Sequence, residues 1–267
     1  MQFVRLNGVT IHYQVISAAP SRPRLVFVNS LGTDFRIWRD VVVQLAGDFS
    51  ILCHDMRGHG LSDTGEASAS IETYAADLAA LIEHAGFAPA VVCGLSIGGL
   101  VAQALHAARP DLVSGLLLAD TAPRIGTPEI WSERIRQVEG GGLASIADRV
   151  AGGWVTESFR STPAFAGYRN MLARQPAEGY LGAVAVLRGI DLTSRAPRID
   201  VPTTCLVGAE DVPTPPGQVE ALSRMIPGAH YQVVSGAAHL PPIERPDAVG
   251  DDIRALAART GADHVRH

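Results

Sequence analysis

Short apolar segments recur along the chain, separated by longer segments in which apolar residues follow helical spacing. Most of the short segments are apolar throughout, a pattern typical of strands that are covered on both faces of a parallel sheet. We therefore predict strands at Val9–Val15, Arg24–Asn29, Ser50–His54, Ala90–Gly94, Val113–Ala119, Thr203–Gly208 and His230–Val234.

The amphipathic segments between these strands carry the start and stop signals of helices. Ser70 is a favourable N-cap for the helical pattern of residues 71–82, and Gly86 stands where a left-handed residue commonly ends a helix. Further helices are predicted at 97–109, where a proline follows, and at 246–259. Strands and helices thus alternate, which indicates an α/β fold.

The alternation is interrupted between residues 123 and 197, where helical patterns follow one another without a strand. The triple glycine Gly140–Gly142 interrupts them and fits a tight turn between helices or a hinge. We interpret residues 1–122 and 198–267 as one core that carries residues 123–197 as an inserted helical lid. The predicted lid helices are Pro128–Glu139, Leu143–Gly152, Ala164–Arg174 and Ala177–Arg188.

Composition and charge narrow the class of protein. With 267 residues, of which 47% are hydrophobic and 18% charged, the chain can bury a large core and is not expected to be disordered. A net charge of −5 without a basic cluster argues against nucleic-acid and membrane partners, so we expect a small-molecule partner. Residues 1–7 do not resemble a signal peptide and no apolar stretch is long enough to span a bilayer. We therefore expect a cytoplasmic protein, whose oligomeric state the sequence leaves open.

The cysteines and the end of the sequence carry no chemistry in this interpretation. Cys53, Cys93 and Cys205 each lie in an apolar run, where a small buried residue is expected rather than a disulfide or a metal ligand. The odd number of cysteines agrees with this. The polar residues from Thr260 to His267 are expected to fray.

One segment places a serine between an apolar strand and a helix-forming run: Gly94, Leu95, Ser96, Ile97 and then two glycines at 98 and 99. A tight turn from strand to helix forces the serine backbone into a strained conformation and presents its hydroxyl above the sheet. Glycines on either side remove side chains that would clash in such a turn. Ser96 is therefore the predicted nucleophile.

A serine nucleophile needs a base and an acid that orients the base. Asp211 follows the strand at 203–208, and His239 lies in a short polar loop after the next strand. Both side chains are therefore expected at the same edge of the sheet as Ser96. Asp120, at the end of the preceding strand, is an alternative acid, and an aspartate in either place can also serve as a turn cap.

Acyl transfer also needs N–H donors that stabilise the negative charge on the carbonyl oxygen. Ile97, which opens the helix after the nucleophile, is expected to supply one of them. The loop after the strand at 24–29 is expected to supply the other, from the N–H of Leu31. Gly32 in the same loop also fits an ordinary turn.

A compact group of potential metal ligands, His54, Asp55 and His59, lies in another loop. No further ligand accompanies it at a spacing typical of metal sites, so we predict no metal centre. Serine-based acyl transfer needs no organic cofactor either, and none is expected.

These residues resemble the α/β-hydrolase superfamily, in which serine, aspartate and histidine follow in this order along the chain. Over essentially the whole chain the sequence is similar, more specifically, to the 3-oxoadipate enol-lactonases. The resemblance implies an α/β-hydrolase fold with a mostly parallel eight-stranded sheet, flanking helices and a helical lid. It is carried by Asn29–Trp38, Asp55–Asp63, Gly94–Gly99, Asp120–Gly126 and Trp131–Ile135. Many relatives have His-Gly where this chain has Asn29-Ser30, so Leu31 is assigned as an oxyanion donor by position alone.

The resemblance implies hydrolysis of 3-oxoadipate enol-lactone to 3-oxoadipate through an acyl-enzyme, within the β-ketoadipate pathway of aromatic compound catabolism. This lactone carries a free carboxylate, which Arg134 is expected to bind. Trp131, one helical turn earlier, and Trp154 are expected to supply apolar walls. An ordinary surface role for the arginine and a place in the lid core for the tryptophans remain the alternative.

Other functions remain open at this point. A carboxylesterase or a cofactor-free perhydrolase would use the same serine chemistry. A sensor that captures a small ligand without turnover is a third hypothesis, because fold and function are separable. The serine at position 96 argues against haloalkane dehalogenases and epoxide hydrolases, which are similar but use aspartate there.

Overall fold

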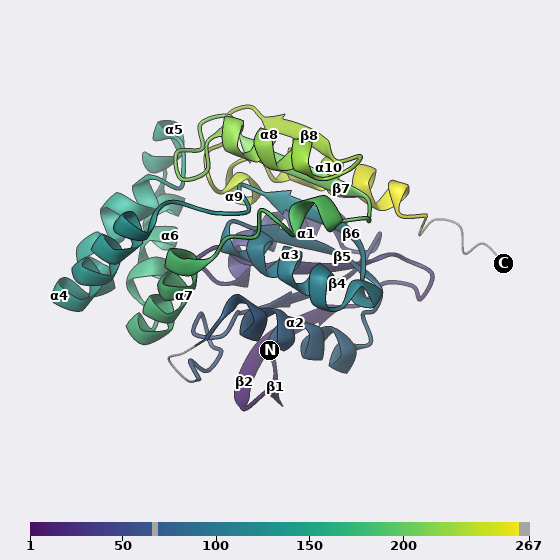
Figure 1. Ribbon diagram of the computed structural model, residues 1–267, viewed down its shortest axis with the longest axis horizontal. Coiled ribbons are helices and arrows are strands. Elements are labelled where there is room, and N and C mark those ends of the chain that lie inside the picture. The colour runs from purple at the N-terminus through teal and green to yellow at the C-terminus, as the bar shows by residue number, and fades with distance from the viewer. Residues whose placement is uncertain (66–68, 262–267) are drawn as a thin grey trace.

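A computed structural model describes residues 1–65 and 69–261 of the chain. Its centre is an eight-stranded sheet in the order β1-β2-β4-β3-β5-β6-β7-β8 (Figure 1). Part of the polar end of the sequence, residues 262–267, for which fraying was predicted, lies outside the described residues. The strands are β1 (Gln2–Leu6), β2 (Val9–Ile16), β3 (Arg24–Val28), β4 (Ser50–His54), β5 (Ala90–Leu95), β6 (Val113–Ala119), β7 (Thr203–Gly208) and β8 (His230–Val234).

The pairing of the strands confirms the predicted fold class. β1 pairs with β2 and β2 with β4 in antiparallel fashion, and every other neighbouring pair of the sheet is parallel. All seven predicted strands are present within a residue or two, while β1 was not predicted. Since parallel strands share one direction, the carboxyl ends of β3, β5, β6, β7 and β8 lie along one edge of the sheet, where the candidate chemistry was expected.

One expectation about burial was wrong. The segment of β8 was taken for a strand that is covered on both faces, but His230, Gln232 and Val233 are exposed. β8 lies at the edge of the sheet, where it pairs among the described residues with β7 alone. Helix α8 packs on β8, but much of the strand stays in contact with solvent. His230 and Gln232 are polar, so the segment is not apolar throughout as a strand covered on both faces is expected to be.

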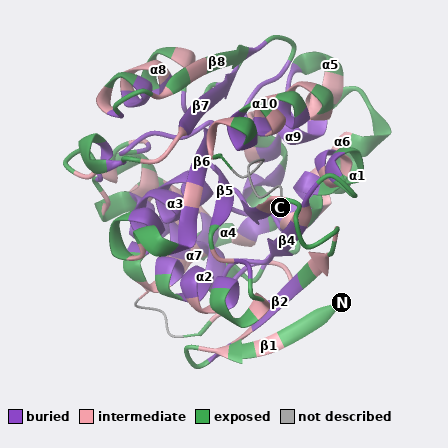
Figure 2. Cartoon of the chain, turned by 90° about the vertical axis from the view of Figure 1, so that its right-hand side faces the viewer, coloured by how far each residue is buried: buried purple, intermediate pink, exposed green. Residues whose placement is uncertain are grey.

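Helices cover both faces of the sheet. Figure 2 shows the buried central strands between α2 and α3 on one side and α1, α9 and α10 on the other. Ser70 caps α2 as predicted, and Gly86 ends it with a φ of 68°. The core helices are α1 (Arg39–Leu45), α2 (Ile71–Ala85), α3 (Ile97–Ala108), α8 (Pro216–Met225), α9 (Pro241–Glu244) and α10 (Pro246–Arg259), with short 3-10 turns η1 (Phe35–Trp38), η2 (Pro110–Leu112) and η3 (Ala196–Arg198).

The core is built from the apolar strands. Every residue of β5 and β7 is buried, and so are Cys53, Cys93 and Cys205, which are free as expected. Burial raises the pKa of each of these thiols, so they stay neutral and unreactive. The sheet is therefore a rigid support for the loops at its edge.

Between β6 and β7 the described chain contains helices and no strand. They are α4 (Pro128–Gly152), α5 (Glu157–Arg160), α6 (Pro163–Ala173) and α7 (Ala177–Gly189). α4 breaks at Gly142, whose φ is 69° and ψ 174°, so its two halves correspond to the two predicted helices. α4 packs on α6 and α7, and these helices gather at one end of the molecule (Figure 1). We call α4 to α7 the helical segment.

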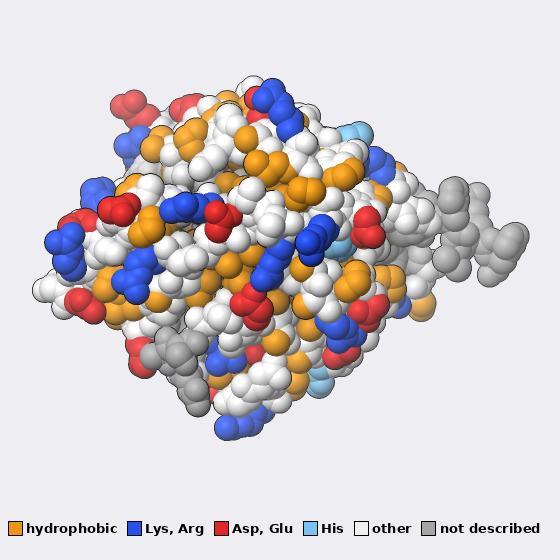
Figure 3. All heavy atoms as spheres, in the orientation of Figure 1, with side chains coloured by type: hydrophobic (Ala, Val, Ile, Leu, Met, Phe, Trp, Pro, Cys, Tyr) orange, Lys and Arg blue, Asp and Glu red, His pale blue; other side chains and the backbone are white. Residues whose placement is uncertain are grey.

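The surface carries charges of both signs. On the face seen in Figure 3, arginine and acidic side chains are interspersed. No helix among the described residues has the length and apolar character needed to cross a membrane.

Candidate active site

The turn between β5 and α3 holds Ser96 in a strained backbone conformation. Its φ is 58° and its ψ is −118°, outside the regions that a residue with a side chain normally adopts. The Ser96 N–H donates to the carbonyl of Ala119 at 2.9 Å, which ties the turn to the end of β6. The hydroxyl-bearing side chain therefore sits where the sequence predicted it, between a buried strand and a helix N-terminus.

The glycines around the turn are needed for space. A Cβ at Gly98 would overlap the carbonyl oxygen of Val28 and lie 2.7 Å from that of Asn29. A Cβ at Gly99 would lie 2.5 Å from the side chain of Thr121. The start of α3 can pack this closely on β3 and on the loop after β6 only because these positions lack side chains.

Asp211 and His239 meet at the neighbouring strand ends. The His239 ring N–H at Nδ1 donates to both carboxylate oxygens of Asp211, each at 3.0 Å. Their loops are joined by a hydrogen bond of 3.0 Å from the Glu210 N–H to the Ala237 carbonyl. Both side chains are buried, with Asp211 4% and His239 3% exposed. The aspartate thus fixes the ring orientation through Nδ1, and Nε2 is the ring nitrogen that Asp211 does not contact.

Thr214 holds the same carboxylate from the opposite direction. Its hydroxyl donates to Asp211 Oδ2 at 2.6 Å and its N–H donates to Oδ1 at 3.2 Å. Burial acts to raise the pKa of Asp211, but the interactions with His239 and Thr214 outweigh it and hold that pKa below its ordinary value. Asp211 is therefore an ionised hydrogen-bond partner for the His239 ring. The sequence analysis did not identify Thr214.

Ser96 and His239 face one cavity of about 300 Å³. The described contacts include no direct hydrogen bond between the serine hydroxyl and the histidine ring. Catalytic hydrogen bonds are often long before substrate binds. Ser96 and His239 are therefore placed in one candidate site because both line the same cavity. Besides these two, the cavity is lined by Ser30, Leu31, Ile125, Gly126, Ile130, Trp131, Arg134, Arg149, Val150, Gly153, Trp154, Tyr180, Leu187, Val212 and Pro213.

The loop that carries Leu31 is anchored below the cavity. The Asn29 side-chain amide donates to the His54 carbonyl at 2.7 Å and accepts from the Trp38 indole at 3.1 Å. Gly32 has a φ of 74°, and a Cβ there would lie 3.1 Å from the ring of Tyr180. Ile97 is the first residue of α3, so its N–H has no partner within the helix. Both candidate oxyanion donors thus belong to fixed backbone.

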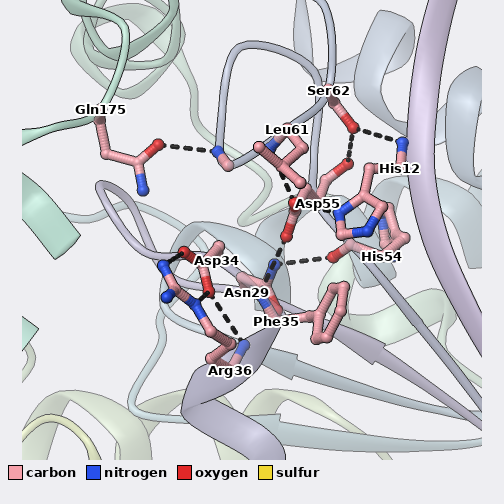
Figure 4. Close-up of polar contacts among 11 residues, drawn as sticks. His12, Asn29, Asp34, Phe35, Arg36, His54, Asp55, Leu61, Ser62 and Gln175 are labelled. Carbon is pink, nitrogen blue, oxygen red and sulfur yellow. Dashed lines mark hydrogen bonds and ion pairs between the residues drawn. The ribbon is translucent and has the colours of Figure 1, made fainter. Parts of the chain in front are cut away.

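A network around Asp55 supports this loop from behind (Figure 4). Its carboxylate accepts from the Phe35 N–H at 3.0 Å, from the Leu61 N–H at 2.9 Å and from His12 Nδ1 at 2.7 Å. The Ser62 hydroxyl donates to its backbone carbonyl at 2.7 Å. Asp55 therefore joins the loops after β3 and β4 to β2.

The group of His54, Asp55 and His59 serves this scaffold. The Nδ1–H of His54 donates to the Phe27 carbonyl, and that of His59 to the Arg57 carbonyl, each at 3.2 Å. Among the described residues they do not converge on a common point as metal ligands would. Burial lowers the pKa of His54 to about 4 and that of His59 below its ordinary value, so both rings are neutral.

The helical segment supplies the opposite wall of the cavity. Trp131 and Trp154 both line it, and the Trp131 indole donates to the Ile125 carbonyl at 2.7 Å. The Arg134 guanidinium lies in the same wall and donates to the Tyr180 hydroxyl at 2.8 Å. The structure therefore brings together at one cavity all three residues that were predicted to bind substrate.

Sequence reasoning missed a second cation in this wall. Arg149 also lines the cavity, and it donates to the side chain of Gln137 in the first half of α4. The break at Gly142 folds the second half of α4 back on the first, which brings Arg149 towards Arg134. The triple glycine was the signal for this, but it does not state which residues meet.

The sheet, the strained serine turn and the buried Asp–His pair at the same edge define an α/β hydrolase. The chain belongs to the alpha/beta hydrolase family, whose sequence model matches residues 25–252.

The relatives that are similar to the chain include enol-lactonases and an esterase. The chain is 31% identical to 3-oxoadipate enol-lactonase 2 of Acinetobacter baylyi over 255 residues, 95% of each protein. The crystal structure of an enol-lactonase from Burkholderia xenovorans LB400 is 32% identical and superimposes with a TM-score of 0.93, over 96% of this chain and 100% of that one. A thermophilic esterase from Thermogutta terrifontis is 30% identical, with a TM-score of 0.89, over 97% and 99% of the two chains.

Proposed function

We propose that the protein hydrolyses a carboxylic ester bond in a small lactone, with Ser96 as nucleophile, His239 as general base and Asp211 as the acid that orients the base. The carrying observation is the Asp211–His239 pair, which faces the same cavity as a serine held in a strained turn. His239 takes the serine proton as the oxygen attacks the carbonyl carbon. It then returns a proton to the leaving ring oxygen, and a water deprotonated by the same ring releases the acyl group.

The N–H groups of Leu31 and Ile97 are the proposed oxyanion donors. Leu31 lines the cavity beside Ser96, and Ile97 begins the helix at whose N-terminus the serine stands. A fixed donor at the developing negative charge is worth roughly 3 to 4 kcal/mol in the transition state. The anchored loop described above keeps the Leu31 backbone in place before substrate arrives.

The proposed substrate is 3-oxoadipate enol-lactone or a lactone of the same chemistry. Arg134 and Arg149 line the cavity, while none of its described lining residues is acidic. A positive wall opposite the serine suits a substrate with a free carboxylate, since a guanidinium binds such a group with two hydrogen bonds. The two enol-lactonase relatives support this choice. When the lactone opens, its ring oxygen leaves as an enol that becomes a ketone, which favours hydrolysis.

The helical segment is proposed as a lid, residues 123–197, that closes the cavity over the core. Trp131 and Trp154 would form its apolar wall. The carbonyl of Trp154 accepts from the Leu240 N–H at 3.0 Å, directly beside His239. This hydrogen bond ties the proposed substrate wall to the residue that follows the proposed general base.

Turnover of the lactone is the test. Purified protein mixed with freshly generated enol-lactone is expected to remove its ultraviolet absorbance, with a kcat/KM at least about tenfold above that for p-nitrophenyl acetate. Ser96→Ala is the control and is expected to lose both activities. If the protein cleaves the ester but leaves the lactone intact, the proposed activity is esterase rather than lactonase. Esterase activity is the second candidate because the chain is 30% identical to the Thermogutta esterase.

A substitution in the proposed lid distinguishes binding of the substrate carboxylate from reaction at the ester bond. Arg134→Ala is expected to raise KM for the lactone about tenfold or more and to leave KM for p-nitrophenyl acetate nearly unchanged, because only the lactone carries the carboxylate. Arg136→Ala, on the same helix with an exposed side chain paired to Glu133, is the matched control. Equal losses on both substrates would remove Arg134 from this role.

A further inference from the structure

Two buried carboxyl groups meet beside His239, and the proposed reaction uses one of them. The other belongs to Asp120, which follows β6 and is 0% exposed. Its φ is 45°, and its N–H donates to the Leu206 carbonyl at 2.8 Å. Its Oδ1 accepts from the Gly208 N–H at 2.9 Å. Backbone and side chain are therefore both tied to β7, the strand that leads to Asp211.

The second oxygen of Asp120, Oδ2, is buried and accepts no hydrogen bond from a conventional donor among the described residues. One oxygen of Asp120, one oxygen of Asp211 and one ring nitrogen of His239 all lie within 4.8 Å of one another. Two ionised carboxylates at this spacing would repel each other strongly away from water, and such pairs retain one proton between them.

The hydrogen bonds decide which carboxyl retains the proton. Asp211 accepts from the His239 ring and from the hydroxyl and N–H of Thr214. Asp120 accepts from the Gly208 N–H alone among the described donors. More donors stabilise a carboxylate more, so the charge belongs to Asp211 and the proton to Asp120.

The surrounding charges act in the same direction. Burial, followed by the negative charge of Asp211, raises the pKa of Asp120 well above its ordinary value. Glu244 adds a smaller effect of the same sign. The Glu244 carboxylate accepts from the Thr156 hydroxyl at 2.6 Å and from the Ala238 N–H at 2.8 Å.

We propose that Asp120 is a positioning residue of the triad: a neutral carboxylic acid whose O–H donates to Asp211. This inference rests on the proposed role of Asp211. The hydrogen bond would hold the Asp211 carboxylate towards the His239 ring and keep one negative charge, rather than two, beside it. A second negative charge would stabilise the protonated ring and leave less free base at neutral pH.

Asp120→Asn and Asp120→Leu test this together. Asn keeps the acceptor for the Gly208 N–H and offers a side-chain N–H to Asp211, so kcat/KM for p-nitrophenyl acetate is expected within about threefold of the wild type. The acid limb of its pH profile is expected at the same pH, because no charge has been removed. Leu has no donor, and kcat is expected to fall about tenfold with KM little changed.

Two kinetic outcomes would overturn the proposal. A shift of the acid limb to lower pH by about one unit in Asp120→Asn would show that the native residue is ionised, because the variant has then lost a charge beside the base. Equal activity of the Asn and Leu variants would show that the donor does not matter. Melting temperatures of both variants separate these results from loss of folding.

A measurement without substrate tests the proton directly. At about pH 8, Asp252, whose pKa burial raises to about 6, is ionised. The infrared spectrum of the wild type at this pH is expected to contain the carbonyl stretch of a protonated carboxylic acid, which moves in D2O and disappears in Asp120→Asn. Absence of the band from the wild type overturns the proposal even if the variant does not fold. Because no substrate is involved, failure of the proposed lactonase function leaves this result interpretable.

Discussion

Thr214 is a side chain outside the proposed triad, and we expect it to act on the triad through its hydrogen bond to Asp211. Thr214→Val removes the 2.6 Å hydrogen bond to the charged carboxylate of Asp211 but keeps the shape of the side chain. Hydrogen bonds to charged groups are worth about 1.5 to 3 kcal/mol, so kcat for p-nitrophenyl acetate is expected to fall about tenfold at nearly constant KM. Thr214→Ser keeps the hydroxyl and is expected to retain activity. An equal loss in both variants would indicate packing rather than the hydrogen bond.

At this scale the sequence predicted the residues whose positions a motif or the chain order fixes. Ser96 stands in a recognisable turn, and Asp211 and His239 each follow a strand that ends at the same edge. Thr214 and Arg149 carried no such signal. The first acts within a proline-containing loop, and the second reaches the cavity only because α4 folds back on itself. Contacts of this kind depend on three-dimensional packing, which periodicity does not contain.

At the scale of elements, the close approach of α3 to β3 is what sets the serine turn. Gly98→Ala places a Cβ against the carbonyls of Val28 and Asn29, so either the helix or the strand end must move. We expect a loss of about 1 to 3 kcal/mol in the free energy of unfolding and a drop in kcat/KM. Urea denaturation and ester hydrolysis measure the two effects.

Gly140→Ala is the matched control for this substitution. Gly140 also lies in a helix, but no neighbouring atom of the residues that the structure describes lies within 4 Å of the position that its Cβ would occupy. The unfolded chain loses freedom while the helix accepts alanine, so a gain of about 0.4 to 1 kcal/mol is expected. If Gly98→Ala were as well tolerated, the close approach would not be needed for the turn.

Elements with strong local signals were predicted well, and weakly marked ones were not. α2 has a capping serine and a terminal glycine, and both were placed correctly. β1 is largely exposed and was missed, while the exposure of β8 was misjudged. The difference is physical: caps and central apolar strands are determined locally, whereas the exposure of an edge depends on what packs beside it.

At the scale of the whole molecule, buried histidines make stability depend on pH. Burial lowers the pKa of His54 from 6.5 to about 4, so the unfolded chain binds a proton at higher pH than the folded one does. The contribution of the neutral His54 ring to the free energy of unfolding is therefore complete above pH 6.5 and is lost as pH falls towards 4. Protonation of this ring is expected to lower the free energy of unfolding by an amount on the order of 3 kcal/mol.

Denaturation in urea at several pH values between 7 and 5 measures this dependence. His54→Gln is expected to be less stable at neutral pH but to show a shallower decline with falling pH than the wild type. His230→Gln, at an exposed position of β8, is the control and is expected to retain the wild-type slope. Identical slopes in all three proteins would contradict the linkage to His54.

The fold class followed from the alternation of strands and helices together with the family resemblance, but the arrangement of the molecule did not. The strand order places β4 between β2 and β3, and it brings the ends of β6, β7 and β8 side by side. Only this arrangement sets Asp120 against Asp211, which in the sequence were two alternatives for the same role. The structure makes them neighbours with different hydrogen bonds.

The central claim is that Ser96 becomes a nucleophile through His239, and labelling with a fluorophosphonate measures this most directly. The serine oxygen attacks phosphorus, fluoride leaves, and mass spectrometry locates the adduct. The account predicts one adduct, on Ser96, with a labelling rate about a thousandfold lower in His239→Ala. An adduct on another residue, or an unchanged rate in His239→Ala, would contradict it.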